Sequence, residues 1–370
     1  MNKWEYKTLD QMGSVQRGRS KHRPRNDARL FGGQYPFIQT ADVKNAPFYI
    51  SEYSGTYNEV GLAQSKLWDI GTLCITIAAN IADTGILAIP ACFPDSVLGF
   101  RAYEDISDVR FVKYCFDILQ KDCKQISQGT AQDNLSWEKL STIKFPCPPI
   151  EVQRKIADIL SAYDDLIENN RKQIKLLEEA AQRLYKEWFI DLRFPGYETT
   201  KIIDGIPAGW EKTLLGNLIE IKYGKDHKNI PDGDIPVYGS GGFMRKCSQA
   251  LHQGEAVLIP RKGSLNNIMY VNETFWTVDT MFYALMKQQN IGFFTYFLLK
   301  SFDMYAMNIG AAVPSMTTSI LNAIDVVLPS AIVLEEFHRN INVLFKRIST
   351  LNKQNDKLME SRDRLLKKLL

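Results

Sequence analysis

The sequence predicts an α+β protein with two similar α/β domains, each followed by a long helix. Three observations predict this class. The chain repeats itself at a spacing of 181 residues, two segments carry a narrow apolar stripe at helical spacing, and a stretch rich in proline and glycine separates the two copies. A chain of 370 residues is long enough for two domains, each with its own core.

The repeat is clearest in the second part of each copy. Residues 129–189 align with residues 310–370 without a gap, so that Leu140 meets Leu321 and Pro148 meets Pro329. Each copy reads as a glycine-led loop, a short strand and a proline, followed by a long helix.

Apolar residues step by four and three along both predicted helices. This is the a/d seam of a coiled coil, sustained over more than four heptads. The alternative is a surface helix with an apolar stripe, which rarely needs a stripe so long and narrow. The predicted coiled-coil and partner-binding seam comprises Ile167, Asn170, Ile174, Leu177, Leu184, Trp188, Ile348, Leu351, Asn355, Leu358, Leu365 and Leu369.

Each seam holds one asparagine, and a lone polar seam residue fixes register at some cost in stability. About forty helical residues at a rise of 1.5 Å give a rod of roughly 60 Å. We expect the two helices to form an antiparallel coiled coil, which relates the two domains by a pseudo-two-fold axis. Trp188 and Arg362 widen the ends of the seam, where we expect them to meet outside partners.

The first parts of the two copies repeat more faintly. Gly18 follows Trp4 by 14 positions, and Gly224 follows Trp210 by the same 14 positions. "YPFIQTADV" at 35 parallels "IPVYGSGGF" at 235, and "GTLCITI" at 71 parallels "GEAVLIP" at 254. The predicted organisation is a domain at 1–150, a helix at 151–190, a linker at 191–209, a domain at 210–332 and a helix at 333–370.

Composition excludes several protein classes. Hydrophobic residues make up 45% of the chain and charged residues 24%, as in a globular protein. No apolar run is long enough to span a membrane, and the first residues lack the apolar core of a signal peptide. We therefore expect a cytoplasmic location and no membrane partner. The six cysteines contain no CxxC and the four histidines are scattered, so we expect no metal site and no cofactor.

No catalytic motif stands out. The chain has no GxxxxGK[ST] loop, and "FPCPPI" at 145 has the wrong first residue for the Asn/Asp-Pro-Pro-aromatic loop of an amino-methyltransferase. Pro94-Asp95 followed by "DCK" at 122 fits a loose nuclease pattern, which we interpret as a chance match because the second copy has no equivalent. We expect no catalytic residues.

A two-fold protein with domains about 60 Å apart suits a long two-fold ligand, and duplex DNA is the obvious one. Net charge is only +3, but residues 17–29 carry six basic residues against Asp27. Because the two copies differ in their loops, they would read different half-sites of a split, asymmetric target.

This pattern resembles the DNA specificity subunit of Type I restriction-modification systems over nearly the whole chain. The resemblance rests on the order of domains and helices and on the phrases "GTAQDNLSWEKLSTIKFPCPPIEVQRKIADIL", "AAQRLYKEWFIDLRFPGYE" and "IPVYGSGGF…LIPRKGS…FWTVDTMF". The second copy departs from it with "PSAIVLEEFHRNI" and "AAVPSMTTS". The resemblance implies a non-catalytic subunit that reads double-stranded DNA, carries two methyltransferase subunits that bind S-adenosylmethionine, and is joined by a restriction translocase-nuclease subunit.

Candidate DNA contacts lie on the loops, and each has a structural alternative. Basic residues neutralise phosphates, arginine also reads guanine, asparagine reads adenine, and glycine-rich backbone approaches phosphate. For the basic residues between 17 and 25, the alternative is a solvated loop, and for Gln39 and Thr40 it is the capping of a strand end. Asn80 and Thr84 could instead support the fold, and "YGSGG" could be a plain hairpin turn. The candidates are Arg17, Arg19, Lys21, Arg23, Arg25, Gln39, Thr40, Asn80, Thr84, Lys222, Tyr223, Lys225, Tyr238, Ser240, Arg261, Lys262, Asn266 and Asn267.

The competing hypothesis is a coiled-coil spacer that holds two protein partners apart without reading DNA. Salt dependence separates the two functions, because phosphate contacts release counterions.

Overall fold

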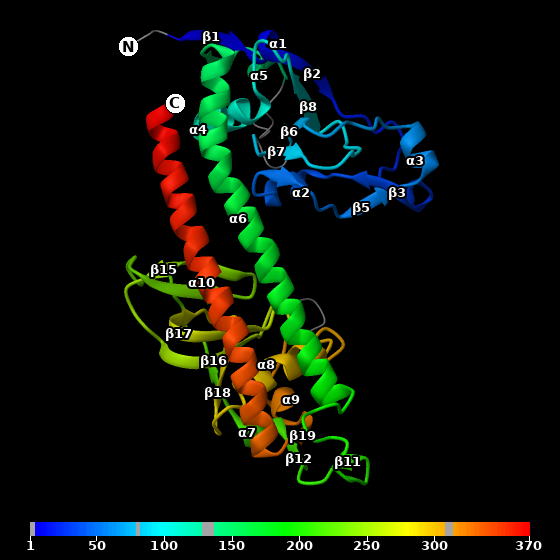
Figure 1. Cartoon of the computed structure of the whole chain (residues 1–370), viewed down its shortest axis with the longest axis vertical. Helices are drawn as coiled ribbons and strands as arrows, with labels where there is room; N and C mark the ends of the chain where they lie inside the picture. Colours follow the sequence, from blue (N-terminus) through cyan, green and yellow to red (C-terminus); the bar gives the residue numbers. More distant parts are fainter. Residues whose placement is uncertain (1–3, 79–81, 128–136, 308–313) are drawn as a thin grey trace. The chain divides into compact units, whose positions relative to one another are not determined.

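The computed structural model describes residues 4–78, 82–127, 137–307 and 314–370, and for 121–127 it describes the backbone alone (Figure 1). The chain divides into two compact units. Unit 1 is Met1–Lys172 with Leu351–Leu370, and unit 2 is Gln173–Thr350. Each of the two long helices therefore contributes one segment to each unit.

Unit 1 is built on a five-stranded sheet in the order β2-β8-β6-β7-β4, in which β4 is parallel to β7 and the other pairs are antiparallel. Two small two-stranded sheets, β1-β9 and β3-β5, accompany it. The strands are β1 (Glu5–Thr8), β2 (Gly13–Arg17), β3 (Phe31–Phe37), β4 (Tyr49–Ile50), β5 (Gly55–Tyr57), β6 (Leu73–Thr76), β7 (Thr84–Leu87), β8 (Val97–Ala102) and β9 (Lys144–Cys147). The helices are α1 (Leu9–Met12), η1 (Ala28–Leu30), α2 (Thr40–Asn45), α3 (Glu59–Ala63), α4 (Val109–Ser127), α5 (Trp137–Leu140) and the start of α6 (Ile150–Tyr185).

Unit 2 is built on a six-stranded sheet in the order β13-β18-β16-β17-β14-β15, in which β14 is parallel to β17. The strands are β10 (Ile202–Ile203), β11 (Ile206–Pro207), β12 (Glu211–Leu214), β13 (Ile219–Tyr223), β14 (Ile235–Gly239), β15 (Gly242–Cys247), β16 (His252–Pro260), β17 (Met269–Thr277), β18 (Met281–Met286) and β19 (Asp325–Leu328). The helices are the π-helical turn η2 (Lys186–Ile190), α7 (Leu215–Leu218), α8 (Gly292–Ser301), α9 (Thr318–Asn322) and α10 (Ala331–Leu369).

The same topology occurs in both units, which confirms two domains of mixed helix and sheet. The order β2-β8-β6-β7 matches β13-β18-β16-β17, and the next strand is parallel in both sheets, β4 in unit 1 and β14 in unit 2. The pairing of β1 with β9 matches that of β12 with β19, and even the register repeats, as Glu5 faces Cys147 and Glu211 faces Leu328. A parallel bridge joins Phe37 to Cys92 in unit 1, where β14 pairs with β17 in unit 2. The faint alignment of 35 with 235 is therefore a structural equivalence.

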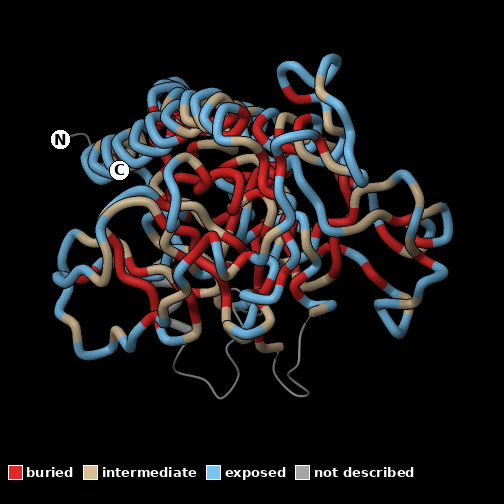
Figure 2. Tube along the Cα trace, turned by 90° about the horizontal axis from the view of Figure 1, so that it is seen from below, coloured by how far each residue is buried: buried red, intermediate tan, exposed pale blue. Residues whose placement is uncertain are grey.

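Both long helices alternate buried and exposed residues with a helical period, as their sequence pattern predicts (Figure 2). In unit 1, Ile156 and Leu160 of α6 share a hydrophobic cluster with Leu366 of α10. Further along, the Asn170 Nδ2 atom donates a hydrogen bond to Asn355 Oδ1 at 2.9 Å. As residue numbers rise along α6, the numbers of the residues they contact on α10 fall. The two segments therefore run antiparallel within unit 1.

In unit 2, Tyr185 of α6 and Trp188 of η2 share a hydrophobic cluster with Phe337 and Ile341 of α10. The predicted seam residues are buried or partly buried in both units. Those buried are Ile167, Asn170, Trp188, Ile348, Leu351 and Asn355, and those partly buried are Ile174, Leu177, Leu184, Leu358, Leu365 and Leu369.

Candidate nucleic-acid interface

The basic loop of unit 1 leaves the sheet at the end of β2 and is held at its start by backbone hydrogen bonds. The Gly18 N–H donates to the Val97 carbonyl at 2.8 Å, and the Arg19 N–H donates to that of Phe93 at 3.0 Å. A Cβ atom on Gly18 would collide with the backbone carbonyl of Pro94. Glycine is therefore required where the loop turns away from the sheet.

The cations of this loop fall into two groups. Arg23 and Arg25 form ion pairs with Asp95, which follows β7 in the chain. Arg17, Arg19 and Lys21 are exposed, and no ion pair or side-chain hydrogen bond engages them within the part of the chain that the structure describes. These three cations are thus the ones available to phosphates.

The end of the same loop is ordered by Asp27, which accepts hydrogen bonds from Arg29 and contacts the His22 ring at 2.8 Å. The Arg29 side chain and backbone N–H, together with His22, hold the pKa of the Asp27 carboxyl well below its usual value. Asp27 therefore stays ionised at neutral pH and neutralises part of the basic loop.

Of the other candidates in unit 1, Gln39 is exposed and is the N-cap residue of α2. Its backbone N–H donates to Asp42 Oδ2 at 2.7 Å, and Thr40 begins the helix. Gln39 thus caps the start of a helix, whereas the alternative considered from the sequence was the capping of a strand end. Thr84 is buried in β7, and Asn80 lies outside the described residues.

Unit 1 contains a hollow of about 620 Å³, which the sequence did not predict. Tyr35, Tyr53 and Leu67 line it, and the Tyr53 side chain is exposed. Tyr35 lies in β3 and Tyr53 on the loop after β4, and two single aromatic residues in different elements give no periodic signal, so only the fold could bring them together.

Unit 2 repeats the turn geometry of the basic loop with fewer charges. The Gly224 N–H donates to the Met281 carbonyl at 3.0 Å, and the Lys225 N–H donates to that of Thr277 at 2.9 Å. A Cβ atom on Gly224 would collide with the carbonyl of Val278. Lys225 is exposed, whereas Lys222 is half-buried and forms an ion pair with Glu220 at 3.4 Å.

The loop after β16 in unit 2 contacts both Tyr223 at the end of β13 and the turn after β14. The Arg261 guanidinium lies over the Tyr223 ring at 5.5 Å, and the Asn267 Nδ2 atom donates to the Ser240 carbonyl at 2.9 Å. Ser240 lies in the turn between β14 and β15, so "YGSGG" forms the hairpin turn that was the alternative to a phosphate loop. The structure thus brings together two pairs of candidates, Tyr223 with Arg261 and Ser240 with Asn267.

Three other candidates in unit 2 are held by the fold, Asn266 and Tyr238 through their side chains and Lys262 through its backbone alone. The Asn266 side chain accepts a hydrogen bond from the Met304 N–H at 2.8 Å and donates to Asp303, so it fixes the loop after α8. The Tyr238 hydroxyl donates to Glu273, and burial together with this carboxylate raises the pKa of Tyr238. Lys262 is held through its backbone, which bonds to Thr280 and bridges to Ser315.

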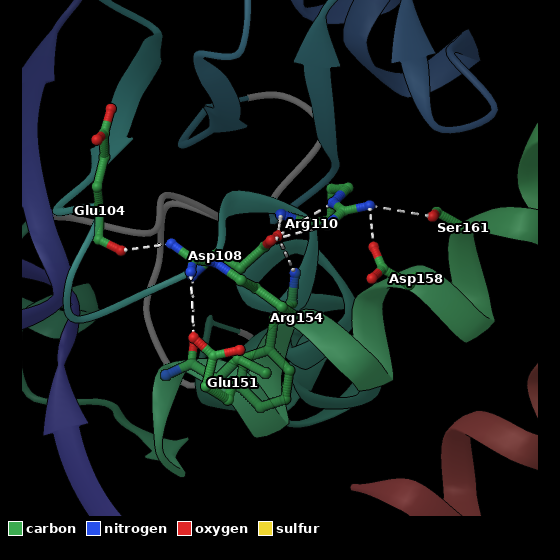
Figure 3. A network of polar contacts seen from close by, with 9 residues as sticks. Glu104, Asp108, Arg110, Glu151, Arg154, Asp158 and Ser161 are labelled. Atoms are coloured by element: carbon green, nitrogen blue, oxygen red, sulfur yellow. Dashed lines mark hydrogen bonds and ion pairs between the residues drawn. The ribbon is translucent and has the colours of Figure 1, made fainter.

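A polar network in unit 1 ties the beginning of α6 to the domain (Figure 3). Arg110, at the start of α4, forms ion pairs with Asp108 at 2.9 Å and with Asp158 of α6 at 2.8 Å. Arg154 of α6 donates to the Glu104 carbonyl at 3.1 Å. The network fixes the direction in which α6 leaves the domain, and helical periodicity alone did not reveal it.

No cluster of His, Cys, Asp or Glu suited to holding a metal ion occurs among the residues that the structure describes. Within the same residues, no helix is long and apolar enough to cross a membrane. The described cysteines are free and buried, and burial raises the pKa of Cys74 and Cys115. The thiols of Cys74 and Cys115 are therefore neutral and unreactive at neutral pH.

Known proteins resemble this chain over nearly its whole length. A family model described as the Type I restriction modification DNA specificity domain matches residues 1–179 and 207–360. The Type I restriction enzyme MjaIX specificity subunit of Methanocaldococcus jannaschii is 26% identical, over 99% of this chain and 92% of that protein. The HindI specificity subunit of Haemophilus influenzae is 22% identical, over 94% and 96%. A crystal structure of the S subunit of a Type I restriction-modification system from M. genitalium superposes on this chain with a TM-score of 0.61 and 18% sequence identity. The superposition covers 100% of this chain and 96% of that one, so the two proteins share the fold.

Proposed function

Because the chain belongs to the Type I restriction-modification DNA specificity family, and is thus a DNA-recognition subunit, we propose that its two domains read two unlike half-sites of one split target. The observation that carries this proposal is the contrast between equivalent loops. Gly18 and Gly224 make the same turn at the end of equivalent strands, but the cations beside the two turns differ. Arg17, Arg19 and Lys21 are free beside the first, whereas Lys222 beside the second is paired with Glu220, and the loop after β16 in unit 2 adds Arg261 over Tyr223 and Asn267 on Ser240.

The two loop surfaces suit different contacts. Arg17, Arg19 and Lys21 would neutralise phosphates and position unit 1 on the duplex. Arg261 and Asn267 carry the side-chain types that read guanine and adenine in the major groove. Stacking on Tyr223 and the hydrogen bond to Ser240 reduce the freedom of these two side chains, which favours base readout over loose phosphate binding.

The two long helices would form an antiparallel coiled coil with pseudo-two-fold symmetry, which separates the two half-sites. The reading domains are residues 1–150 and 210–332, the spacer helices 151–190 and 333–370, and the linker 191–209. The proposal is supported by the antiparallel contacts of α6 and α10 within unit 1, and by the repeated register of the flanking strands. A rod of roughly 60 Å leaves unread base pairs between the half-sites.

The chain would act without catalysis in a cytoplasmic complex. Its partners would be two methyltransferase subunits, which carry S-adenosylmethionine, and restriction translocase-nuclease subunits. Relatives named as specificity subunits of Type I restriction enzymes support this assembly.

The test compares two variants on the same selected target. Asn267→Ala together with Arg261→Ala should relax the sequence preference in one half-site by about 1–3 kcal/mol per lost base contact and leave the other half-site unchanged. Removal of the Arg17, Arg19 and Lys21 charges should weaken binding to all sequences alike. The measurement is competition binding with single-base substitutions across the target. A preference relaxed in both half-sites by the unit 2 variant would contradict separate reading domains.

A further inference from the structure

Two polar pairs lie on the contact between α6 and α10 in unit 1. The first is the hydrogen bond between the side-chain amides of Asn170 and Asn355. The second is the ion pair between Asp164 and Arg362, with 2.5 Å between Oδ1 and Nη1. The sequence placed Arg362 at the end of the seam, where it was expected to meet an outside partner, but its side chain is engaged inside the chain.

The ion pair is buried on the Asp164 side. Only 3% of the Asp164 side chain is exposed, and its second oxygen accepts a hydrogen bond from the Tyr114 hydroxyl at 2.5 Å. Burial raises the pKa of the Asp164 carboxyl, and Arg362 and Tyr114 oppose that rise. A buried ion pair adds little net stability over apolar residues of similar size, but removing one partner leaves a costly unpaired charge. Such a pair is therefore better suited to selecting a partner helix than to holding it tightly.

The internal repeat shows what each polar residue would meet in another pairing. At the offset of 181, Asp164 corresponds to Phe345 and Arg362 to Ala181. Asn170 corresponds to Leu351, and Asn355 to Ile174. The polar residues are thus not repeated, although the helices that carry them are.

The equivalent site in unit 2 is apolar. The Phe345 ring packs against Phe293 at 4.8 Å and Tyr296 at 5.9 Å, and Ala181 is fully buried. Tyr296 is the repeat counterpart of Tyr114, so the same aromatic residue faces a carboxylate in unit 1 and a phenyl ring in unit 2.

We propose that these two polar pairs specify the pairing of α6 with α10 and exclude the pairing of either helix with its own copy in a second chain. In the same antiparallel register, two copies of α6 would place Asp164 opposite Ala181 and Asn170 opposite Ile174. Two copies of α10 would place Arg362 opposite Phe345 and Asn355 opposite Leu351. Every polar seam residue would then lose its partner, whereas α6 with α10 satisfies all four.

The inference rests on the helix pairing in the proposed function, and its test uses the full-length chain without DNA. In the seam variant, all four polar residues become leucine (Asp164→Leu, Asn170→Leu, Asn355→Leu and Arg362→Leu). The control variant changes the same residue types, one acid, one base and two asparagines, at exposed positions of the same helices. It carries Asp165→Leu, Asn169→Leu, Asn352→Leu and Lys353→Leu.

Self-association is measured by size-exclusion chromatography with light scattering over a range of concentrations. Co-precipitation of two differently tagged full-length chains serves as a second measurement. The seam variant should associate with itself at least tenfold more tightly than the wild type and the control. A seam variant that associates no more than the wild type, or a control that associates as strongly as the seam variant, would overturn the proposal.

Unfolding in urea tests the pairing of α6 with α10 separately from the role of the polar pairs in partner choice. Arg362→Ala should lower the unfolding midpoint, because it leaves Asp164 buried and unpaired, and the double change Asp164→Leu with Arg362→Leu should restore it. An unchanged midpoint in Arg362→Ala would refute the pairing of α6 with α10 itself. A restored midpoint without increased self-association would refute only the role in partner choice. Circular dichroism of each variant establishes that the helices are intact.

Discussion

Removal of the three free cations of the unit 1 loop is the perturbation whose size follows most directly from the structure. Arg17, Arg19 and Lys21 are exposed and without an ion pair among the described residues, whereas Arg23 and Arg25 are paired with Asp95. Each phosphate contact contributes about 0.9 to the slope of log Kobs against log salt concentration. Changing the three residues to alanine should therefore flatten this slope by about 2.7.

The difference is large enough to measure by fluorescence anisotropy with a labelled duplex that carries the target. Over a fourfold rise in salt, the wild-type chain should lose about 40-fold more affinity than the variant, as that slope difference implies. The control removes three exposed cations of the helices in unit 1, by changing Lys155, Lys353 and Lys357 to alanine. A loop variant with the wild-type slope, or a control that flattens the slope equally, would refute the assignment of this loop to phosphate binding.

Two further predictions concern stability and are checked by urea unfolding. Gly224→Ala should destabilise the chain by about 1–3 kcal/mol, because the added methyl group collides with a backbone carbonyl that cannot move freely; a wild-type midpoint would show that the turn adapts. Tyr114→Phe should cost about 1.5–3 kcal/mol, because the carboxylate of Asp164 loses a buried hydrogen-bond donor. A Tyr114→Phe variant as stable as the wild type would show that Arg362 alone satisfies that carboxylate.

The scaffold could be predicted from the sequence because its signals are local and occur twice. The spacing from Trp4 to Gly18, repeated from Trp210 to Gly224, marks the same run of strand, short helix and strand in each unit, β1-α1-β2 and β12-α7-β13. Helical periodicity likewise predicted α6 and α10.

The chemistry of the loops could not be predicted in the same way, because it depends on partners far along the chain. Asn266 was a candidate adenine reader, but its side chain binds residues 37 and 38 positions later, Asp303 and Met304. Tyr238 is engaged by Glu273, 35 positions away. Residue type alone does not distinguish a free amide or hydroxyl from one that the fold has already satisfied.

The same limit applies to the helices. The a/d pattern predicted Asn170 and Asn355 on the seam, and the structure pairs them with each other. It did not reveal the ion pair between Asp164 and Arg362, whose members are 198 positions apart. A charged residue next to an apolar stripe is usually exposed to solvent. Only the packing of the two helices identifies the Asp164 side chain as buried.

The central claim is that one chain reads two unlike half-sites at a fixed separation. The most direct test is selection of random duplex DNA by the full-length chain, co-expressed with the proposed methyltransferase partner, followed by sequencing of the bound fraction. The account predicts a split motif with two different halves and an unread gap of constant length, set by helices of roughly 60 Å. A single continuous motif, a gap of variable length or binding without sequence preference would contradict it.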